Sequence, residues 1–260
     1  MADQKLLPGK FVWFEYVSRD ADRAKAQGFY GEVLGWRVVP FPMGPETYEM
    51  IYAGETMLGG YAEPDSDKQP AHWISYVSVE DVDGAARTAA ANGGKIVAAP
   101  FDAPTVGRMA RIADPQGAEL YLFRSATGNA PDLQQAPHGH FLWNELHTTD
   151  PVAALAFYAK VVGFDQRAMD MGPAGTYHVV SRDGVDRGGV THYLNPGTPP
   201  HWLPYVSVDD ADAAVARARR LGATIAMNPE DIPGIGRIAV LIDPLGAAIA
   251  VMKPSPEMTK

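Results

Sequence analysis

The residues best suited to chemistry form a short motif, Trp-x-Glu, that occurs twice. Trp13 and Glu15 make the first copy, and Trp143 and Glu145 make the second. Both copies lie in stretches whose aromatic and β-branched residues predict strands. Side chains two apart on a strand share a face. An indole beside a carboxylate suits an aromatic or planar ligand, because the ring can stack on the indole while the carboxylate accepts a hydrogen bond.

The two glutamates are also the candidate catalytic residues. A carboxylate that is desolvated beside tryptophan has a raised pKa, in the range useful for a general base. Glu15 and Glu145 would then support proton abstraction, epimerisation or ring closure. The alternative is structural: the tryptophans fill the core, and each glutamate pairs with an arginine such as Arg108 or Arg237.

Histidines make the two copies of the motif unequal. His147 follows Glu145 by two residues on the same strand face, where the first copy has Val17. His192 lies near the end of the last strand of its module, where we align Ala62 in the first half. One expectation is therefore a single functional cleft in the second half; the other is two equal clefts.

Other residues recur at matching places. His72 and His201 each precede a tryptophan, and we expect them to cap a strand or line the mouth of a cleft. Glycine pairs at 59–60 and 188–189 indicate a bulge or a close approach of two backbones.

Two charged pairs recur as well. Arg108 and Arg237 each begin a strand, and each can bind either a substrate carboxylate or the aspartate six residues earlier. Asp114 and Asp243 begin the sequence DPxG, which predicts a tight turn before the last strand.

These residues belong to a chain that repeats itself. HWISYVSVEDVDGA near the middle of the first half is matched by HWLPYVSVDDADAA in the second, and FVWFEYVSRD is matched by FLWNELHTTD. Each half reads strand, helix, strand, strand, strand twice over, which indicates tandem duplication. We predict an α+β fold of four βαβββ modules, near residues 11–64, 72–124, 141–194 and 201–253.

A small, polar stretch containing proline and glycine separates the halves. It reads SATGNAPDLQQAPHGH and is typical of a linker. We predict an N-terminal extension over 1–10, one domain over 11–124, a linker over 125–140, a second domain over 141–253 and a tail over 254–260.

Composition narrows the class of protein. The 260 residues carry a net charge of −9, and without a basic stripe to neutralise phosphates we expect neither nucleic acid nor an anionic membrane as partner. The absence of cysteine excludes disulfides and thiolate metal sites. No stretch has the length and apolarity of a leader or a membrane span. We expect a soluble, cytoplasmic monomer or homodimer whose partner is a small organic ligand.

The paired modules, the helix ends FYGEVLGW and FYAKVVGF and the DPxG before the last strand resemble the vicinal oxygen chelate superfamily. That superfamily includes glyoxalase I, extradiol dioxygenases and the bleomycin- and fosfomycin-resistance proteins. The chain is most similar to the two-domain type sometimes labelled hydroxylase or likened to a mycobacterial secreted antigen. The resemblance implies curved mixed sheets that wrap a cleft in each domain. It also implies a divalent metal bound by His or Glu on the first and last strands of the modules.

The implied ligand positions carry other residue types here. The first-strand positions fall on Trp13, Ile74, Trp143 and Leu203, the last-strand positions on Tyr121 and Ala250, and the remaining two lie near 60–61 and 190–191. None is an ordinary ligand of such an ion. We therefore expect no cofactor. The alternative is zinc, nickel, iron or manganese at a displaced site of Glu145, His147 and His192.

The predicted function is the binding of an aromatic or planar compound, of the sequestration or resistance type. The alternative is an enzyme of the same superfamily: a metal-dependent lyase or dioxygenase with a displaced site, or a metal-free isomerase or cyclase that uses Glu15 or Glu145. The expected ligand-binding residues are Trp13, His72, Arg108, Tyr121, Trp143, His147, His201 and Arg237.

Overall fold

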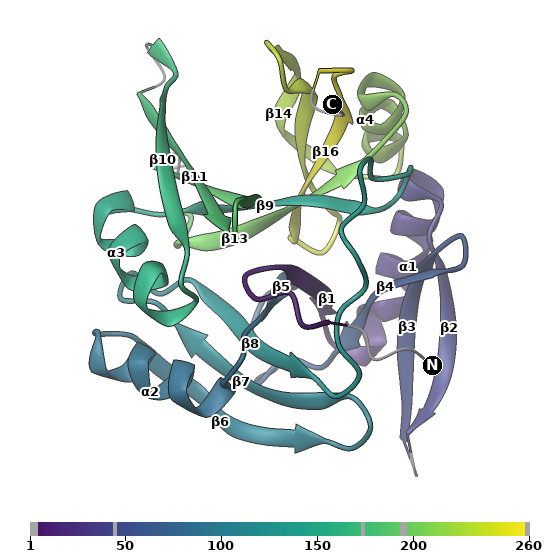
Figure 1. Ribbon diagram of the computed structural model, residues 1–260. Helices are drawn as coiled ribbons and strands as arrows, with labels where there is room; N and C mark the ends of the chain where they lie inside the picture. Colours follow the sequence, from purple (N-terminus) through teal and green to yellow (C-terminus); the bar gives the residue numbers. More distant parts are fainter. Residues whose placement is uncertain (1–4, 44–45, 173–174, 193–196, 258–260) are drawn as a thin grey trace. The chain divides into compact units, whose positions relative to one another are not determined.

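A computed structural model describes residues 5–43, 46–172, 175–192 and 197–257 (Figure 1). Residues 1–4 of the predicted N-terminal extension, 193–194 at the end of the third predicted module and 258–260 of the predicted tail lie outside these ranges. Within the described ranges, no helix has both the length and the apolar character needed to cross a membrane.

The chain contains four copies of one βαβββ module, which confirms the predicted fold class (Figure 1). The first comprises β1 (Phe11–Val17), α1 (Asp20–Leu34), β2 (Arg37–Met43), β3 (Glu46–Ala53) and β4 (Thr56–Ala62). The second comprises β5 (His72–Ser78), α2 (Val82–Ala91), β6 (Lys95–Ala103), β7 (Gly107–Ala113) and β8 (Glu119–Ser125). The third comprises β9 (Phe141–His147), α3 (Pro151–Val161), β10 (Asp165–Asp170), β11 (Thr176–Arg182) and β12 (Val185–Thr191). The fourth comprises β13 (His201–Ser207), α4 (Ala211–Arg220), β14 (Thr224–Ile232), β15 (Gly236–Ile242) and β16 (Ala248–Pro254).

Two eight-stranded mixed sheets result, with strand orders β2-β3-β4-β1-β5-β8-β7-β6 and β10-β11-β12-β9-β13-β16-β15-β14. In every module the first strand pairs in parallel with the last, as β9 does with β12. Three of the four outermost strands contain proline: β2 has Pro40 and Pro42, β6 has Pro100 and β14 has Pro229. Proline has no N–H to donate, so it is tolerated at a sheet edge.

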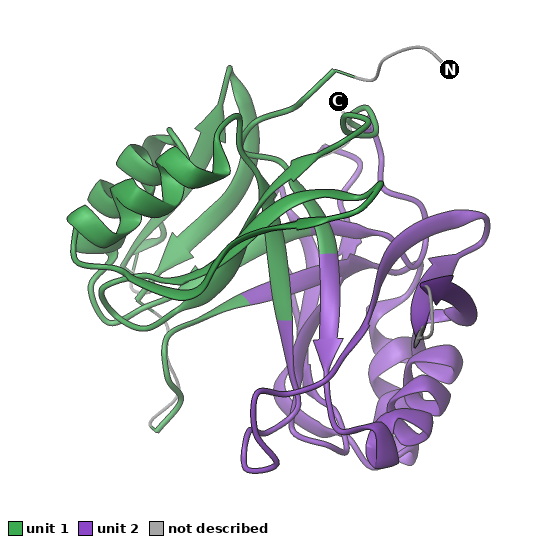
Figure 2. Cartoon of the chain, turned by 90° about the horizontal axis from the view of Figure 1, so that it is seen from below, with its two compact units in different colours: residues 1–13, 74–132, 143–202 green, residues 14–73, 133–142, 203–260 purple. Residues whose placement is uncertain are grey.

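The described chain divides into two compact units, each of which combines parts of both halves (Figure 2). Unit 1 comprises residues 1–13, 74–132 and 143–202, and unit 2 comprises residues 14–73, 133–142 and 203–260. In unit 1, one hydrophobic cluster receives Ala89 of α2, Phe157 of α3 and Leu146 of β9. Burial of such side chains contributes about 25 cal/mol per Å² of apolar surface to folding.

A buried aspartate from DPxG anchors the interior of unit 1. Asp114 Oδ1 accepts hydrogen bonds from the backbone N–H groups of Gln116 and Ala118, each at 2.9 Å, which confirms the predicted turn. Its Oδ2 accepts one from the Tyr158 hydroxyl of α3 at 3.3 Å. Tyr158 in turn accepts one from the indole N–H of Trp202 at 3.0 Å. The turn of the second module thereby holds the helix of the third.

Unit 2 repeats this arrangement with one more hydroxyl. Asp243 Oδ2 accepts hydrogen bonds from Tyr16 at 2.6 Å and Tyr30 at 3.0 Å, and Tyr30 accepts one from the indole N–H of Trp73 at 2.9 Å. Burial and the charge of Asp243 raise the pKa of Tyr30 well above its usual value, so this hydroxyl stays protonated and donates. The tyrosine of the FYxx helix end therefore has a structural role that the sequence motif did not reveal.

We expect Tyr158→Phe to lower the free energy of unfolding by about 1–3 kcal/mol, because it leaves a buried indole N–H and a buried carboxylate oxygen without their partner. Tyr52→Phe is the matched control, since the Tyr52 hydroxyl meets only the Met50 sulfur, at 3.9 Å, among the hydrogen bonds of the described residues. Denaturant unfolding of both variants measures the difference. Equal stability of the two would contradict the structural role of the Tyr158 hydroxyl.

Candidate functional site

The best-developed polar cluster surrounds Glu145 in unit 1. Every second residue of β9 points to the same face, and Trp143, Glu145 and His147 share one face. Leu146 points to the other face, where it is fully buried in the hydrophobic cluster. The three side chains therefore lie on the sheet face that points away from α2 and α3. Glu145 exposes only 8% of its surface, so its charge is held largely out of water.

Directed hydrogen bonds satisfy this carboxylate. Tyr177 of β11 hydrogen-bonds with Glu145, and the Tyr177 oxygen accepts a bond from the indole N–H of Trp143 at 2.9 Å. Burial first, and then the charge of Glu145, raises the pKa of Tyr177 far above its usual value, so the phenol remains a donor. His147 Nε2 lies 2.7 Å from Glu145 Oε1. The buried carboxylate thus has a hydrogen-bond partner on each of two neighbouring side chains, Tyr177 and His147.

Glycines on β12 make this contact possible. β12 lies between β11 and β9, and Gly189 pairs with Glu145. A Cβ atom at Gly189 would overlap the Tyr177 hydroxyl, and one at Gly188 would collide with the backbone carbonyl of Asn144. Of the two predicted explanations for the glycine pair, close approach is confirmed, both to a backbone and to a side chain.

A second imidazole completes the cluster. The rings of His147 and His201 have centroids 5.1 Å apart and are tilted by 34°. His201 Nδ1 lies 2.9 Å from the carbonyl oxygen of Pro199. Burial, together with the charge of His147, lowers the pKa of His201, although the Pro199 hydrogen bond and Glu145 act in the opposite direction. This imidazole is accordingly neutral near neutral pH.

Part of the cluster recurs in unit 2. The Tyr48 hydroxyl donates to Glu15 Oε1 at 2.6 Å, and a Cβ atom at Gly60, which pairs with Glu15, would overlap Tyr48. Sequence reasoning missed both tyrosines. The available signal was the dipeptide Thr-Tyr, whose tyrosine precedes the second glycine of the pair by the same twelve residues in each half.

The strand register corrects one alignment. Val17 pairs with Ala62 and His147 pairs with Thr191, so Thr191 is the counterpart of Ala62, and the predicted equivalence with His192 is wrong by one residue. His192 follows the end of β12 and is exposed. A shift of one residue moves a side chain to the other face of a strand.

The donor atoms of the described residues are not arranged as a metal site. The described residues include no group of three His, Cys, Asp or Glu side chains placed to bind an ion, so Glu145, His147 and His192 are not gathered into the displaced site. At the positions implied by the family resemblance, Ile74, Leu203 and Ala250 are buried hydrophobic side chains.

The two predicted arginines lie in surface ion pairs. Arg108 forms two hydrogen bonds with Asp83 of α2, at 2.6 and 2.9 Å, and one with Asp102 at 2.9 Å. Arg237 repeats the pattern with Asp212 and Asp231. The predicted pairing with Asp102 and Asp231, the alternative to substrate binding, is thus present. Each arginine also has a second aspartate partner on the preceding helix, Asp83 or Asp212. The two arginines named for the structural alternative, Arg108 and Arg237, therefore hydrogen-bond with aspartates.

Other candidates occupy separate surroundings. The Tyr121 ring stacks on Tyr76 at 4.3 Å, and His72 Nδ1 lies 3.0 Å from the carbonyl oxygen of Pro70. Trp13 and Trp143 are half-buried, whereas the core tryptophans Trp36, Trp73 and Trp202 are fully buried. This difference favours a surface role for the tryptophans of the Trp-x-Glu motif.

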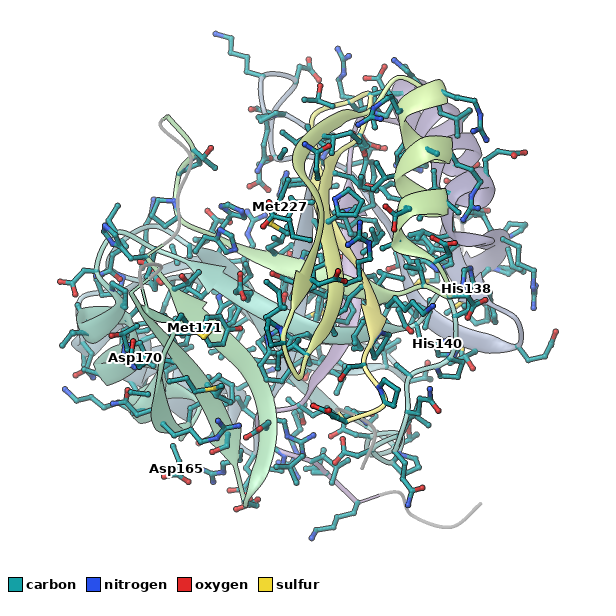
Figure 3. The ribbon with its side chains drawn as sticks, turned by 90° about the horizontal axis from the view of Figure 1, so that it is seen from above. His138, His140, Asp165, Asp170, Met171 and Met227 are labelled. Carbon is teal, nitrogen blue, oxygen red and sulfur yellow. The ribbon has the colours of Figure 1, made fainter. Side chains whose placement is uncertain are left out.

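A hollow of about 450 Å³ lies elsewhere, in unit 2, and is lined by residues 135–138, 207–209 and 253–254. It contains none of the predicted site residues. On the linker, whose His138 and His140 are labelled in Figure 3, His138 Nδ1 lies 3.2 Å from the backbone nitrogen of Asp209. Backbone hydrogen bonds from Gly139 to Ser207 and from Ser207 to His140, each 2.8 Å, join the linker to the end of β13.

We expect Gly189→Ala to lower the free energy of unfolding by roughly 1–3 kcal/mol, because the added methyl group displaces the Tyr177 hydroxyl. Gly28→Ala is the control: its Cβ would meet no atom within 4 Å, so the variant should match the wild type or gain up to about 1 kcal/mol from helix propensity. Combining Gly189→Ala with Tyr177→Phe should cost less than the sum of the single changes. Additive costs would show that the glycine serves another purpose.

The lowered pKa of His201 predicts a pH-dependent stability. The unfolded state takes up a proton near pH 6.5, above the folded-state pKa, so this contribution to stability is present above about pH 6.5 and is lost as the pH falls. His201→Gln should therefore lose less stability on acidification than the wild type. Denaturant unfolding between about pH 8 and pH 5 tests this, with His192→Gln as the control. Parallel curves for wild type and His201→Gln would contradict it.

Comparisons with known proteins match the observed architecture. Residues 10–122 match the family described as Glyoxalase/Bleomycin resistance protein/Dioxygenase superfamily, and residues 144–252 match the family described as Glyoxalase-like domain. Among solved structures, the Mn(II)-bound glyoxalase from Novosphingobium aromaticivorans aligns with a TM-score of 0.63 at 17% identity, covering 97% of this chain and 90% of that one. The 2,2',3-trihydroxybiphenyl 1,2-dioxygenase from Sphingomonas wittichii strain RW1 aligns with a TM-score of 0.65 at 14% identity, covering 95% and 91%. Both show a shared fold.

Two relatives are closer in sequence. "Putative glyoxylase CFP32" of Mycobacterium tuberculosis is 36% identical over 241 residues, covering 91% of this chain and 92% of the relative. "Anthracycline biosynthesis protein DnrV" of Streptomyces peucetius is 30% identical over 271 residues, covering 96% and 94%. Matches along both halves, together with four βαβββ modules, lead to one conclusion: the chain belongs to the Glyoxalase/Bleomycin resistance protein/Dioxygenase superfamily.

Proposed function

We propose that the chain binds a small, planar organic molecule on the sheet face that carries Trp143, Glu145 and His147, without a metal ion. The observation that carries this proposal is the Glu145 cluster itself. Shielding a carboxylate from water is costly, and here the cost is offset by hydrogen bonds with Tyr177 and His147. A half-buried indole beside that point supplies a stacking surface.

The relatives support an aromatic ligand. DnrV of Streptomyces peucetius is named for anthracycline biosynthesis, and anthracyclines are planar, fused-ring compounds with phenolic hydroxyl groups. A phenol would stack on Trp143 and donate its proton towards the cluster. This chemistry matches the ligand class that the Trp-x-Glu motif predicted.

Proton-transfer catalysis is the second candidate, and the contact between Glu145 and His147 favours it. A carboxylate 2.7 Å from an imidazole is an arrangement that can remove a proton and return it. The reaction class would be isomerisation or ring closure, as predicted for a metal-free enzyme. Binding and catalysis differ in a measurable way, because only catalysis converts the ligand.

We expect an anthracycline to bind saturably, and Trp143→Ala to weaken binding roughly ten-fold, equivalent to about 1.4 kcal/mol, through loss of stacking. Quenching of tryptophan emission by the ligand gives the dissociation constant. Trp13→Ala is the matched change in the other copy of the motif. Equal weakening by the two variants would contradict a preference for the second half of the chain.

The same titration separates the two candidates. Saturable binding with an unchanged ligand on chromatography indicates sequestration. Conversion that Glu145→Gln abolishes, with binding retained, indicates an enzyme. A wild-type protein that binds neither an anthracycline nor a simple phenol would contradict the proposed function.

A further inference from the structure

The hydrogen bonds around Glu145 have only one consistent direction. The indole N–H of Trp143 can only donate, so the Tyr177 oxygen accepts from it and the single phenolic proton points to Glu145. An ionised Glu145 carries no proton of its own and can only accept hydrogen bonds. The short contact with His147 is therefore made by an N–H on Nε2 of the imidazole. In the neutral ring, the proton acceptor is then Nδ1.

The second imidazole is fixed by the same reasoning. The carbonyl oxygen of Pro199 can only accept, so His201 donates from Nδ1, and Nε2 is its acceptor atom. The lowered pKa of His201 agrees with a neutral ring. The two rings have centroids 5.1 Å apart, and in the neutral form of each ring the acceptor atom is Nδ1 for His147 and Nε2 for His201.

We propose that His147 accepts the proton of the bound molecule at Nδ1, and that Glu145 is a positioning residue that holds the imidazole in this tautomer. This assignment rests on the proposed binding function and divides the roles within the site. The bond between the proton and the ligand oxygen or carbon breaks, its electron pair stays on the ligand, and a new N–H bond forms on His147. The resulting imidazolium is stabilised by the adjacent carboxylate.

Burial and occupancy make Glu145 the less suitable acceptor. It exposes 8% of its surface and already takes hydrogen bonds from Tyr177 and His147. These two hydrogen bonds and the burial leave less of the carboxylate available to a ligand. The first half of the chain keeps a glutamate–tyrosine bond, between Glu15 and Tyr48, but has Val17 where His147 stands. The proposed proton acceptor is consequently confined to the second half.

Nitrogen-15 NMR of the histidine rings tests the assignment without any ligand. The wild type should show His147 protonated at Nε2 and His201 protonated at Nδ1, with the His147 signals identified by their loss in His147→Val. Glu145→Gln should mix the His147 tautomers, whereas Glu15→Gln should leave them unchanged. A wild-type His147 protonated at Nδ1 overturns the proposal, and so does a His147 tautomer that is indifferent to Glu145→Gln.

A second measurement uses 4-nitrophenol, a planar phenol that turns yellow when it loses its proton. At a mildly acidic pH, the wild type and Glu15→Gln should bind it as the phenolate, and His147→Val, which copies the residue of the first half, should bind it as the neutral phenol. Equal phenolate formation by His147→Val overturns the proposal. If the wild type binds no phenol, the proposed function fails. The role of Glu145 is still tested separately, by the His147 tautomer that nitrogen-15 NMR measures.

Discussion

Two buried aspartates hold the architecture together. Asp114 and Asp243 use one carboxylate oxygen to close the turn before the last strand and the other to accept tyrosine hydroxyls. Tyr158 and Tyr30 stand on helices that are distant in sequence from those turns. A charge buried in this way is tolerable only when its hydrogen bonds are complete. The requirement explains why each compact unit joins modules from both halves of the chain.

The candidate site uses the same pair of groups, a carboxylate and a tyrosine, for another purpose. Around Asp114 the network is enclosed by core side chains, and its polar groups are satisfied internally. Around Glu145 it lies on the sheet face opposite the Leu146 side chain and includes the imidazole of His147. Gly189 allows this by leaving room for the Tyr177 hydroxyl to reach across a strand. Space made by a missing side chain is therefore as important to the site as the polar groups themselves.

The two halves carry related polar clusters, and the second has His147 where the first has Val17. Both halves keep the glutamate, its tyrosine and the glycine between them, which suggests that this trio serves the shared fold of the site. His147 stands in the second half at the position that Val17 has in the first, and its imidazole can exchange a proton. At the positions where the family resemblance implies metal ligands, the chain has Ile74, Leu203 and Ala250 in its hydrophobic interior. On β9, the polar side chains Glu145 and His147 lie two and four residues after Trp143, which occupies another of the implied ligand positions.

The sequence by itself determined the fold class, the four modules, the DPxG turns and the Trp-x-Glu motif, because alternation, turn residues and repetition are properties of local sequence. It also indicated that Glu145 and His147 share a face. Tyrosines 48 and 177 stayed hidden because they act across an intervening strand, and His192 was misplaced because only pairing fixes register. Which modules share a unit, and which polar groups surround Glu145, depends on contacts between residues far apart in the chain. Those contacts exist only once tertiary structure brings the buried polar groups together, where each must find a partner.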